Sequence, residues 1–263
     1  MSKPRDPKLG AELTLVDHLI ELRDRIMKSL AAIVVIFLSL FYFANDIYTF
    51  VADPLISVLP ENMGMIAIDP TAPFLAPFKL TFFVALCLAA PYILYQVWSF
   101  IAPGLYKNEK ELAIPLFISS VVLFYAGIAF AYYVMFGLVF SFFVSVAPEG
   151  IMVTPDITSF LSFALAIFFA FGIAFEIPVA VFLVIWIGLV EPEDLVEKRP
   201  YVIVFCFVVG MLLTPPDPFS QSMLAIPMWG LFELGIFCGR FIKKKQAAQE
   251  AAEEIGRASC RER

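Results

Sequence analysis

The sequence predicts an all-α membrane protein whose chain crosses the bilayer six times, and three observations support this fold class. The mean hydropathy is +0.87. Hydrophobic residues make up 61% of the 263 residues and charged residues only 16%, which is less charge than a water-soluble surface of this size needs. Several segments are apolar over the roughly 20 residues that a helix needs to cross a bilayer. A transmembrane β-barrel would instead show short segments of alternating polarity.

The six predicted spans are apolar segments separated by polar or proline-containing turns. They are residues 29–45, 80–106, 112–148, 157–175 continued by 177–190, 200–216 and 218–232. An even number of spans puts both termini on the same side. With the N-terminus inside, 17 of the 18 Lys and Arg residues fall in cytoplasmic segments, and the exception, Lys79, flanks the second span. The positive-inside rule therefore predicts that both termini are cytoplasmic.

The polar flanks predict two further helices. Apolar residues recur at helical spacing in residues 12–26, which predicts an amphipathic helix leading into the first span. The alternative is a helix that only lies at the bilayer interface. The long outside loop 46–77 contains a second such pattern at 47–59, which predicts a short helix capping the outer face. We expect residues 1–242 to form a single transmembrane domain and residues 243–263 to be a disordered cytoplasmic tail.

The spans are uneven in length and several contain proline. The fifth has 13 uninterrupted apolar residues, 201–213, which reach roughly 20 Å as a helix against about 30 Å of hydrocarbon. A proline inside a helix frees the carbonyl four residues earlier and favours a bend. Such prolines are Pro91, Pro115, Pro178 and Pro227. The stretch "GIFCG" at 235–239 matches GxxxG, which predicts close helix packing.

Glu176 is the most unusual residue, because it lies in the middle of an apolar span two residues before Pro178. An ionised side chain at the centre of a membrane helix costs about 2.5–3.5 kcal/mol on insertion scales. One interpretation is a protonated glutamate that is hydrogen-bonded to a neighbouring helix. The other is a polar site exposed in a recess beside a kink. The cost of burial favours the second interpretation.

A second group of charges is predicted on the cytoplasmic side. Glu109 and Glu111 lie in a short loop beside two lysines, and Glu21 lies on the same side of the membrane. Carboxylates near aromatic and aliphatic residues would suit a ligand with guanidinium groups, which they bind in a bidentate manner. Alternatively these charges only balance the neighbouring lysines, and composition alone favours that interpretation.

Catalysis is not expected from this sequence. The aspartates fall outside the spans, and the lone histidine, His18, lies outside the bilayer, which argues against an aspartyl dyad, a Ser–His pair or a zinc site within it. No glycine-rich phosphate loop occurs. We therefore predict a protein that is not an enzyme and that has no cofactor or metal site. Any energy for its work must come from the membrane gradient or from a partner.

Several motifs resemble one known family, TatC, the multispanning receptor subunit of the twin-arginine protein translocase. The similarity extends from about residue 15 to residue 242 in consistent order. The motifs are "HLIELRDR" (18–25), "PYILYQVWSFIAPGLYKNEKE" (91–111), "AFGIAFEIPVAV" (170–181), "KRPYVIV" (198–204) and "FVVGMLLTPPDPFSQ" (207–221). The resemblance implies six helices in a curved, glove-like wall with short fifth and sixth spans. The residues themselves predict only the short fifth span.

The resemblance also implies a function and partners. Members of the family bind the signal peptides of folded cargo proteins at the cytoplasmic face of the bacterial inner membrane. They assemble with TatA- and TatB-type single-span subunits, and transport uses the proton-motive force. By the same resemblance we expect a multi-pass protein that contacts membrane lipid, self-associates in the assembled complex and has no nucleic-acid partner.

Carried over motif by motif, the resemblance implies roles for particular residues. The site for the paired arginines falls on Glu21 and Glu109, with Phe100 and Leu105 lining the same region. The acidic residue of the concave face falls on Glu176. Structural or assembly roles are expected for Arg23, Pro54, Lys79, Tyr132, Pro178 and Asp217.

Two other functions are compatible with parts of the sequence. A proton-coupled transporter of small solutes would use Glu176 as its proton site, but the sequence has no inverted repeat and few paired charges within the spans. A purely structural scaffold would bind partners without recognising cargo. Solute uptake would favour the first alternative, and partner binding without cargo recognition would favour the second.

Overall fold

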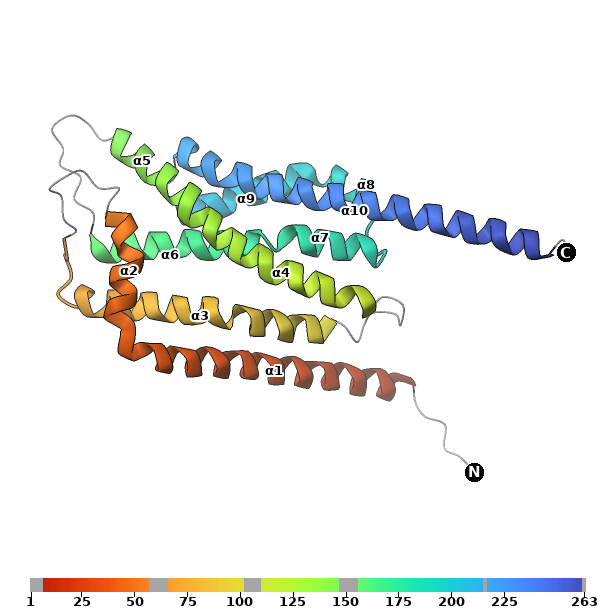
Figure 1. Cartoon of the computed structure of the whole chain (residues 1–263), viewed down its shortest axis with the longest axis horizontal. Coiled ribbons are helices and arrows are strands. Elements are labelled where there is room, and N and C mark those ends of the chain that lie inside the picture. Colours follow the sequence, from red (N-terminus) through yellow and green to blue (C-terminus); the bar gives the residue numbers. More distant parts are fainter. Residues whose placement is uncertain (1–6, 57–65, 102–109, 147–155, 215–216, 262–263) are drawn as a thin grey trace, which may run out of the picture. The chain divides into compact units, whose positions relative to one another are not determined.

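The computed structural model describes residues 7–56, 66–101, 110–146, 156–214 and 217–261, and these residues are almost entirely helical (Figure 1). The elements follow in the order α1 (Pro7–Leu40), η1 (Phe41–Phe43), α2 (Ala44–Ile56), α3 (Ala72–Ile101), α4 (Lys110–Phe130), η3 (Ala131–Phe136), α5 (Gly137–Val146), α6 (Ile157–Ala174), α7 (Ile177–Trp186), α8 (Pro192–Glu197), α9 (Arg199–Leu213) and α10 (Pro218–Arg261).

The helices of the described residues confirm the six predicted spans. Five stretches are long and apolar enough to cross a membrane: Val16–Phe50, Ala72–Ile101, Ile114–Phe143, Ile157–Trp186 and Pro218–Lys244. The remaining apolar helix is α9, with 15 residues. At 1.5 Å per residue α9 is roughly 22 Å long, which confirms the short fifth span.

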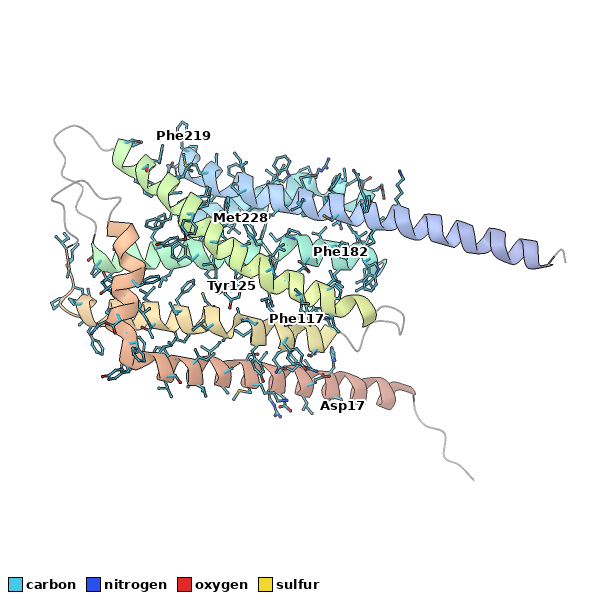
Figure 2. The ribbon with its side chains drawn as sticks, in the orientation of Figure 1. Asp17, Phe117, Tyr125, Phe182, Phe219 and Met228 are labelled. Atoms are coloured by element: carbon cyan, nitrogen blue, oxygen red, sulfur yellow. The ribbon has the colours of Figure 1, made fainter. Side chains whose placement is uncertain are left out.

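Large apolar side chains are exposed along these helices, as a surface in contact with lipid requires (Figure 2). Leu38 on α1, Tyr125 on α4 and Phe219 on α10 are examples. A soluble protein rarely exposes extended apolar patches, whereas a helix in contact with lipid presents apolar side chains to it. The exposed side chains therefore agree with the composition in indicating a polytopic membrane protein.

The N-terminal helix is longer than the predicted first span. Helix α1 runs without interruption from the amphipathic segment into the apolar segment, so the predicted amphipathic helix and the first span are one helix. Because α1 is straight (Figure 1), it cannot lie along the interface at one end and cross the bilayer at the other. The helix predicted in the outside loop is observed as α2, which turns away from α1 and packs against α3. Residues 57–59 of that prediction lie outside the described residues.

Two expectations about the C-terminal region are corrected. The sixth spanning stretch, Pro218–Lys244, has 27 residues, so the short sixth span implied by the resemblance is not observed. Helix α10 also continues to Arg261, whereas we expected a disordered tail from residue 243. The physical reason is composition, because the segment after Lys245 is rich in Ala, Gln and Glu, which are strong helix formers.

The prolines inside the spans differ in their effect. Helices α3, α4 and α10 continue through Pro91, Pro115 and Pro227. At Pro178 the helix is interrupted, because α6 ends at Ala174 and α7 begins at Ile177. The third span contains a different irregularity, the π-helical turn η3 between α4 and α5, which the sequence did not predict.

The chain divides into two compact units. One comprises Met1–Val121 with Asp156–Thr158, and the other comprises Val122–Pro155 with Ser159–Arg263. In the first unit α1 and α2 pack against α3, with Phe37 of α1 in edge contact with Phe78 and Phe82. In the second unit α10 packs against α7 and α9. A single transmembrane domain over residues 1–242 remains a prediction.

The GxxxG stretch makes the close contact that the sequence predicts. Gly235 and Gly239 are buried on the face of α10 that packs against α7. A Cβ atom at Gly235 would lie 2.9 Å from Cβ of Val181 and 3.0 Å from Cα of Pro178. At Gly239 it would meet the side chain of Ile185. Small residues let two membrane helices approach closely, and dispersion contacts then hold them together.

We predict that Gly235→Ala lowers the thermal stability of the protein in detergent micelles. The added methyl group must displace the α7 backbone at Pro178, and overpacking of this kind typically costs about 1–3 kcal/mol. The matched control is Gly230→Ala on the same helix, where an added Cβ meets no atom within 4 Å. Equal melting temperatures for the two variants would contradict the proposed tight contact between α7 and α10.

Candidate functional site

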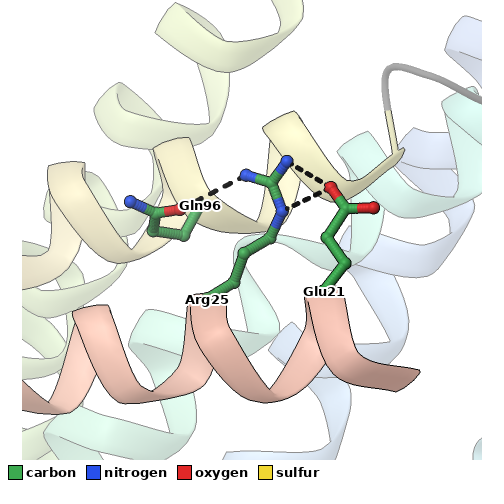
Figure 3. A network of polar contacts seen from close by, with 3 residues as sticks. All are labelled: Glu21, Arg25 and Gln96. Atoms are coloured by element: carbon green, nitrogen blue, oxygen red, sulfur yellow. Dashed lines mark hydrogen bonds and ion pairs between the residues drawn. The ribbon is translucent and has the colours of Figure 1, made fainter. Parts of the chain in front are cut away.

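Glu21 belongs to a polar network between α1 and α3 that has Arg25 at its centre (Figure 3). Its Oε1 atom accepts hydrogen bonds from Nε of Arg25, at 3.0 Å, and from Nη2 of the same guanidinium. Nη1 of Arg25 donates to Oε1 of Gln96 on α3 at 3.3 Å. Glu21 and Arg25 are four residues apart, so they are neighbours on one face of the helix. One guanidinium thus joins a carboxylate on α1 to an amide on α3.

The three side chains of the network differ in their exposure to solvent. The Glu21 side chain is 39% exposed and that of Arg25 is 21% exposed, while Gln96 is buried. Figure 3 shows the second carboxylate oxygen of Glu21 directed away from Arg25. Charge-assisted hydrogen bonds from guanidinium to carboxylate are roughly twice as strong as neutral ones. Glu21 is therefore a partly shielded anion that binds a guanidinium and remains accessible from outside.

Phe100 lies beside this network on the same two helices. Its ring stacks on the imidazole of His18, with centroids 4.2 Å apart and an angle of 22° between the ring planes. His18 is three residues before Glu21 on α1, and Phe100 is four residues after Gln96 on α3. The structure thus brings Glu21 and Phe100, both predicted site residues, to one end of the α1–α3 pair. His18 is exposed, so the stacked pair borders the solvent.

The other expected members of this site are not placed. Leu105 and Glu109 lie outside the described residues. Glu111 is in the first turn of α4, but its side chain is also outside them. Arg23 is exposed and pairs with its neighbour Asp24, with 2.8 Å between Nη2 and Oδ1. The proximity of Glu109 to Glu21 therefore stays a prediction.

Glu176 lies at the break between α6 and α7. It is half-buried and directly precedes the first residue of α7, with Pro178 in the second helical position. Its N–H donates to the Ile173 carbonyl three residues back, at 2.9 Å, instead of the carbonyl four residues back. Pro178 has no N–H to offer the Ala174 carbonyl. The predicted combination of a carboxylate with a helix kink is confirmed, while its role stays a prediction.

The residues expected to have structural roles occupy different positions. Pro54 is within α2, and its side chain is outside the described residues. Lys79 is exposed in the first third of α3. Tyr132 lies in the π-helical turn, where its ring contacts Tyr133 and Phe168. Asp217 precedes α10 and caps it, because Oδ1 accepts the N–H of Ser220 at 2.8 Å.

Asp217 also borders a cavity of about 620 Å³ at the start of α10. The remaining lining residues are apolar: Phe142, Phe143 and Val146 of α5, and Phe219 of α10, which is labelled in Figure 2. The hydrogen bond from the Ser220 backbone lowers the pKa of the Asp217 carboxyl, and the Ser220 side chain contributes in the same direction.

Some interactions were not predicted from the sequence. Glu233 on α10 forms an ion pair with Arg199 at the start of α9. The roles of Arg25 and Gln96 were also missed. The only available signal was the i, i+4 spacing of Glu21 and Arg25, since Gln96 is 71 residues from Arg25.

Comparison with known proteins gives consistent matches. The family model described as "Sec-independent protein translocase protein (TatC)" matches residues 17–227. Curated TatC proteins from Azotobacter chroococcum and Escherichia coli (strain K12) are 57% and 58% identical, over 91% and 90% of this chain and 94% and 92% of theirs. A crystal structure titled as the twin-arginine translocase receptor TatC superposes with a TM-score of 0.78 at 37% identity, covering 85% of this chain and 98% of that one.

We predict that the cap at Asp217 makes stability depend on acid pH. Because the pKa of the folded carboxyl is lowered, its contribution is complete above the unfolded value of about 3.9 and is lost as the pH falls through the lower folded pKa. Asp217→Asn keeps a capping oxygen but cannot titrate, so its melting temperature should fall less steeply with decreasing pH. Parallel curves for the two proteins would contradict this role.

We also predict that Asp217→Ala, which removes the capping oxygen, accelerates amide exchange in the first turn of α10 by about fivefold at neutral pH.

Proposed function

The chain belongs to the TatC family, and from this premise we propose that it is the receptor for twin-arginine signal peptides. It is a subunit of a Sec-independent protein translocase and a multi-pass protein of the bacterial inner membrane. The comparisons support this function over the alternative of a small-solute transporter. We further propose that the paired arginines of a signal peptide bind at Glu21 and Glu109.

One observation supports the proposal above the others: the Glu21 carboxylate already holds a guanidinium in this structure. An arginine side chain cannot be deprotonated in proteins, so its receptor needs a fixed anion. The anion must also be partly shielded from water, because Coulomb attraction weakens in a high dielectric. Glu21 meets both conditions, and its second oxygen is directed away from Arg25 (Figure 3).

The surroundings of Glu21 suit the rest of a signal peptide. Phe100 offers an aromatic surface at the same end of α1 and α3, and we propose that Leu105 extends it. A guanidinium stacks on aromatic faces as well as pairing with carboxylates, whereas an ammonium behaves as a point charge. This difference favours Arg-Arg over Lys-Lys at the site.

Glu176 is proposed as a contact for partner subunits. A carboxylate at a helix break within a span can receive a polar group from another membrane helix, or hold water that weakens the bilayer locally. The partners proposed are TatA- and TatB-type single-span subunits, with further copies of this chain in the assembled complex. We propose that the proton-motive force drives transport by that complex.

We predict that Glu21→Gln and Glu109→Gln each weaken binding of an Arg-Arg signal peptide by roughly 10- to 100-fold. The glutamine keeps the shape but loses a charge-assisted hydrogen bond, which is worth about 1.5–3 kcal/mol. Glu109→Asp should retain part of the binding, because it keeps the charge. The measurement is photocrosslinking of a reactive signal peptide in membranes, with Lys-Lys in place of Arg-Arg as the ligand control.

The matched protein control is Asp24→Asn, because Asp24 is an exposed carboxylate three residues from Glu21 that is paired with Arg23. Labelling of Asp24→Asn should equal that of the parent. If Glu21→Gln and Glu109→Gln both label as strongly as Asp24→Asn, the proposed binding site is wrong. If Lys-Lys labels as strongly as Arg-Arg, the carboxylates recognise charge alone.

For Glu176 we predict that Glu176→Ala reduces crosslinking to TatA- and TatB-type subunits and reduces transport, while the protein still inserts and folds. The alanine removes the polar group but leaves the break that Pro178 imposes. Accumulation and thermal stability in membranes should therefore stay near the parent values. A loss of folded protein would instead support a carboxylate that serves only internal packing.

A further inference from the structure

The carboxylate proposed to bind the signal peptide is occupied by a residue of the chain itself. Arg25 donates two hydrogen bonds to the same oxygen of Glu21, and its side chain is more buried than that of Glu21. A ligand guanidinium that used this oxygen would meet the Arg25 guanidinium already in place. Two guanidiniums at one carboxylate repel each other, so Arg25 must yield or share the site.

We propose that Arg25 competes with the ligand for Glu21 and thereby sets the affinity of the receptor. After a ligand has displaced Arg25 from Glu21, Gln96 still accepts a hydrogen bond from Arg25. This inference rests on the proposed function, because it concerns the same site. Arg25 and Gln96 are thus positioning residues of signal-peptide recognition, although neither has to touch the peptide.

Gln96 is suited to this role by its burial and its chemistry. Its side chain is buried on α3, and its amide oxygen already accepts Nη1 of Arg25 at 3.3 Å. An arginine released from Glu21 with no other acceptor would leave its donors unsatisfied in a partly shielded place, which is costly. A neutral acceptor at this position reduces that cost without holding the arginine as strongly as a carboxylate does.

The size of the effect follows from competition. When a site is available only a fraction of the time, the apparent dissociation constant rises by the inverse of that fraction for every ligand that needs it. Ion pairs at i, i+4 and exposed pairs contribute at most about 1 kcal/mol. Removal of the competitor should therefore tighten binding by about two- to fivefold. Arg-Arg and Lys-Lys peptides that both need Glu21 should gain by the same factor.

The experiment measures binding of a fluorescent Arg-Arg signal peptide to the full chain in lipid nanodiscs. Arg25→Gln should bind two- to fivefold more tightly than the parent. Arg25→Lys keeps the charge but lacks the fork that reaches Glu21 and Gln96 together, so it should bind with intermediate affinity. Lys28→Gln is the control for net charge, because Lys28 is exposed on the same helix one turn further on.

A double-mutant cycle tests the role of Gln96. Gln96→Leu removes the second acceptor, so displacement of Arg25 costs more and the peptide should bind more weakly. In the Arg25→Gln background the same change should have no effect, because no arginine remains to be held. A purely structural role of Gln96 would weaken binding equally in both backgrounds and would overturn this part of the proposal.

The outcomes separate this inference from the proposed function. If Arg25→Gln binds as the parent does or more weakly, while Glu21→Gln still loses binding, then Arg25 is not a competitor but the receptor site stands. If Lys28→Gln tightens binding as much as Arg25→Gln, the effect is one of net charge and the competitor is rejected. If Glu21→Gln binds as the parent does, the proposed site itself fails. Thermal melting of each variant verifies that the compared proteins are folded.

Discussion

The constraint on which this structure depends is the cost of placing charge along helices that cross a bilayer. An unpaired ion there costs several kcal/mol, so charged groups must be paired, lie near a helix end or sit where the backbone itself is irregular. The chain uses all three solutions. Glu21 is paired with Arg25 on α1, Glu233 of α10 is paired with Arg199 at the first residue of α9, and Glu176 lies at the break between α6 and α7.

The same constraint explains why the helices approach closely where they do. Helices in lipid gain little from hydrophobic burial, because lipid tails are as apolar as leucine side chains, so van der Waals contact and polar bridges must hold them together. Gly235 and Gly239 bring α10 against α7. The contact at Gly235 includes Pro178, two residues after Glu176. The break that places the carboxylate is therefore supported from the side by a close helix contact within the second unit.

The sequence predicted those features that depend on local composition. Apolar length gave the six spans and the short fifth one, and helical spacing gave α2 and the amphipathic start of α1. What it missed depends on interactions between distant segments or on propensity outside the spans. The pairing of Arg199 with Glu233 joins residues 34 apart, and the bond from Arg25 to Gln96 joins residues 71 apart. We expected a disordered tail, but its high content of Ala and Glu favours a helix.

The candidate site illustrates why resemblance and structure contribute different things. Resemblance selected Glu21 among 24 acidic residues, which no pattern of spacing could have done. It could not indicate that the carboxylate is already satisfied, because that depends on the rotamer of Arg25 and on the approach of α3. In the proposed receptor this pairing has a physical advantage. A carboxylate with no partner would cost free energy when it is partly shielded from water. A carboxylate without a competitor would also hold its ligand longer. An internal guanidinium keeps the carboxylate paired and partly shielded. It returns as the peptide leaves, which suits a receptor that must release each cargo.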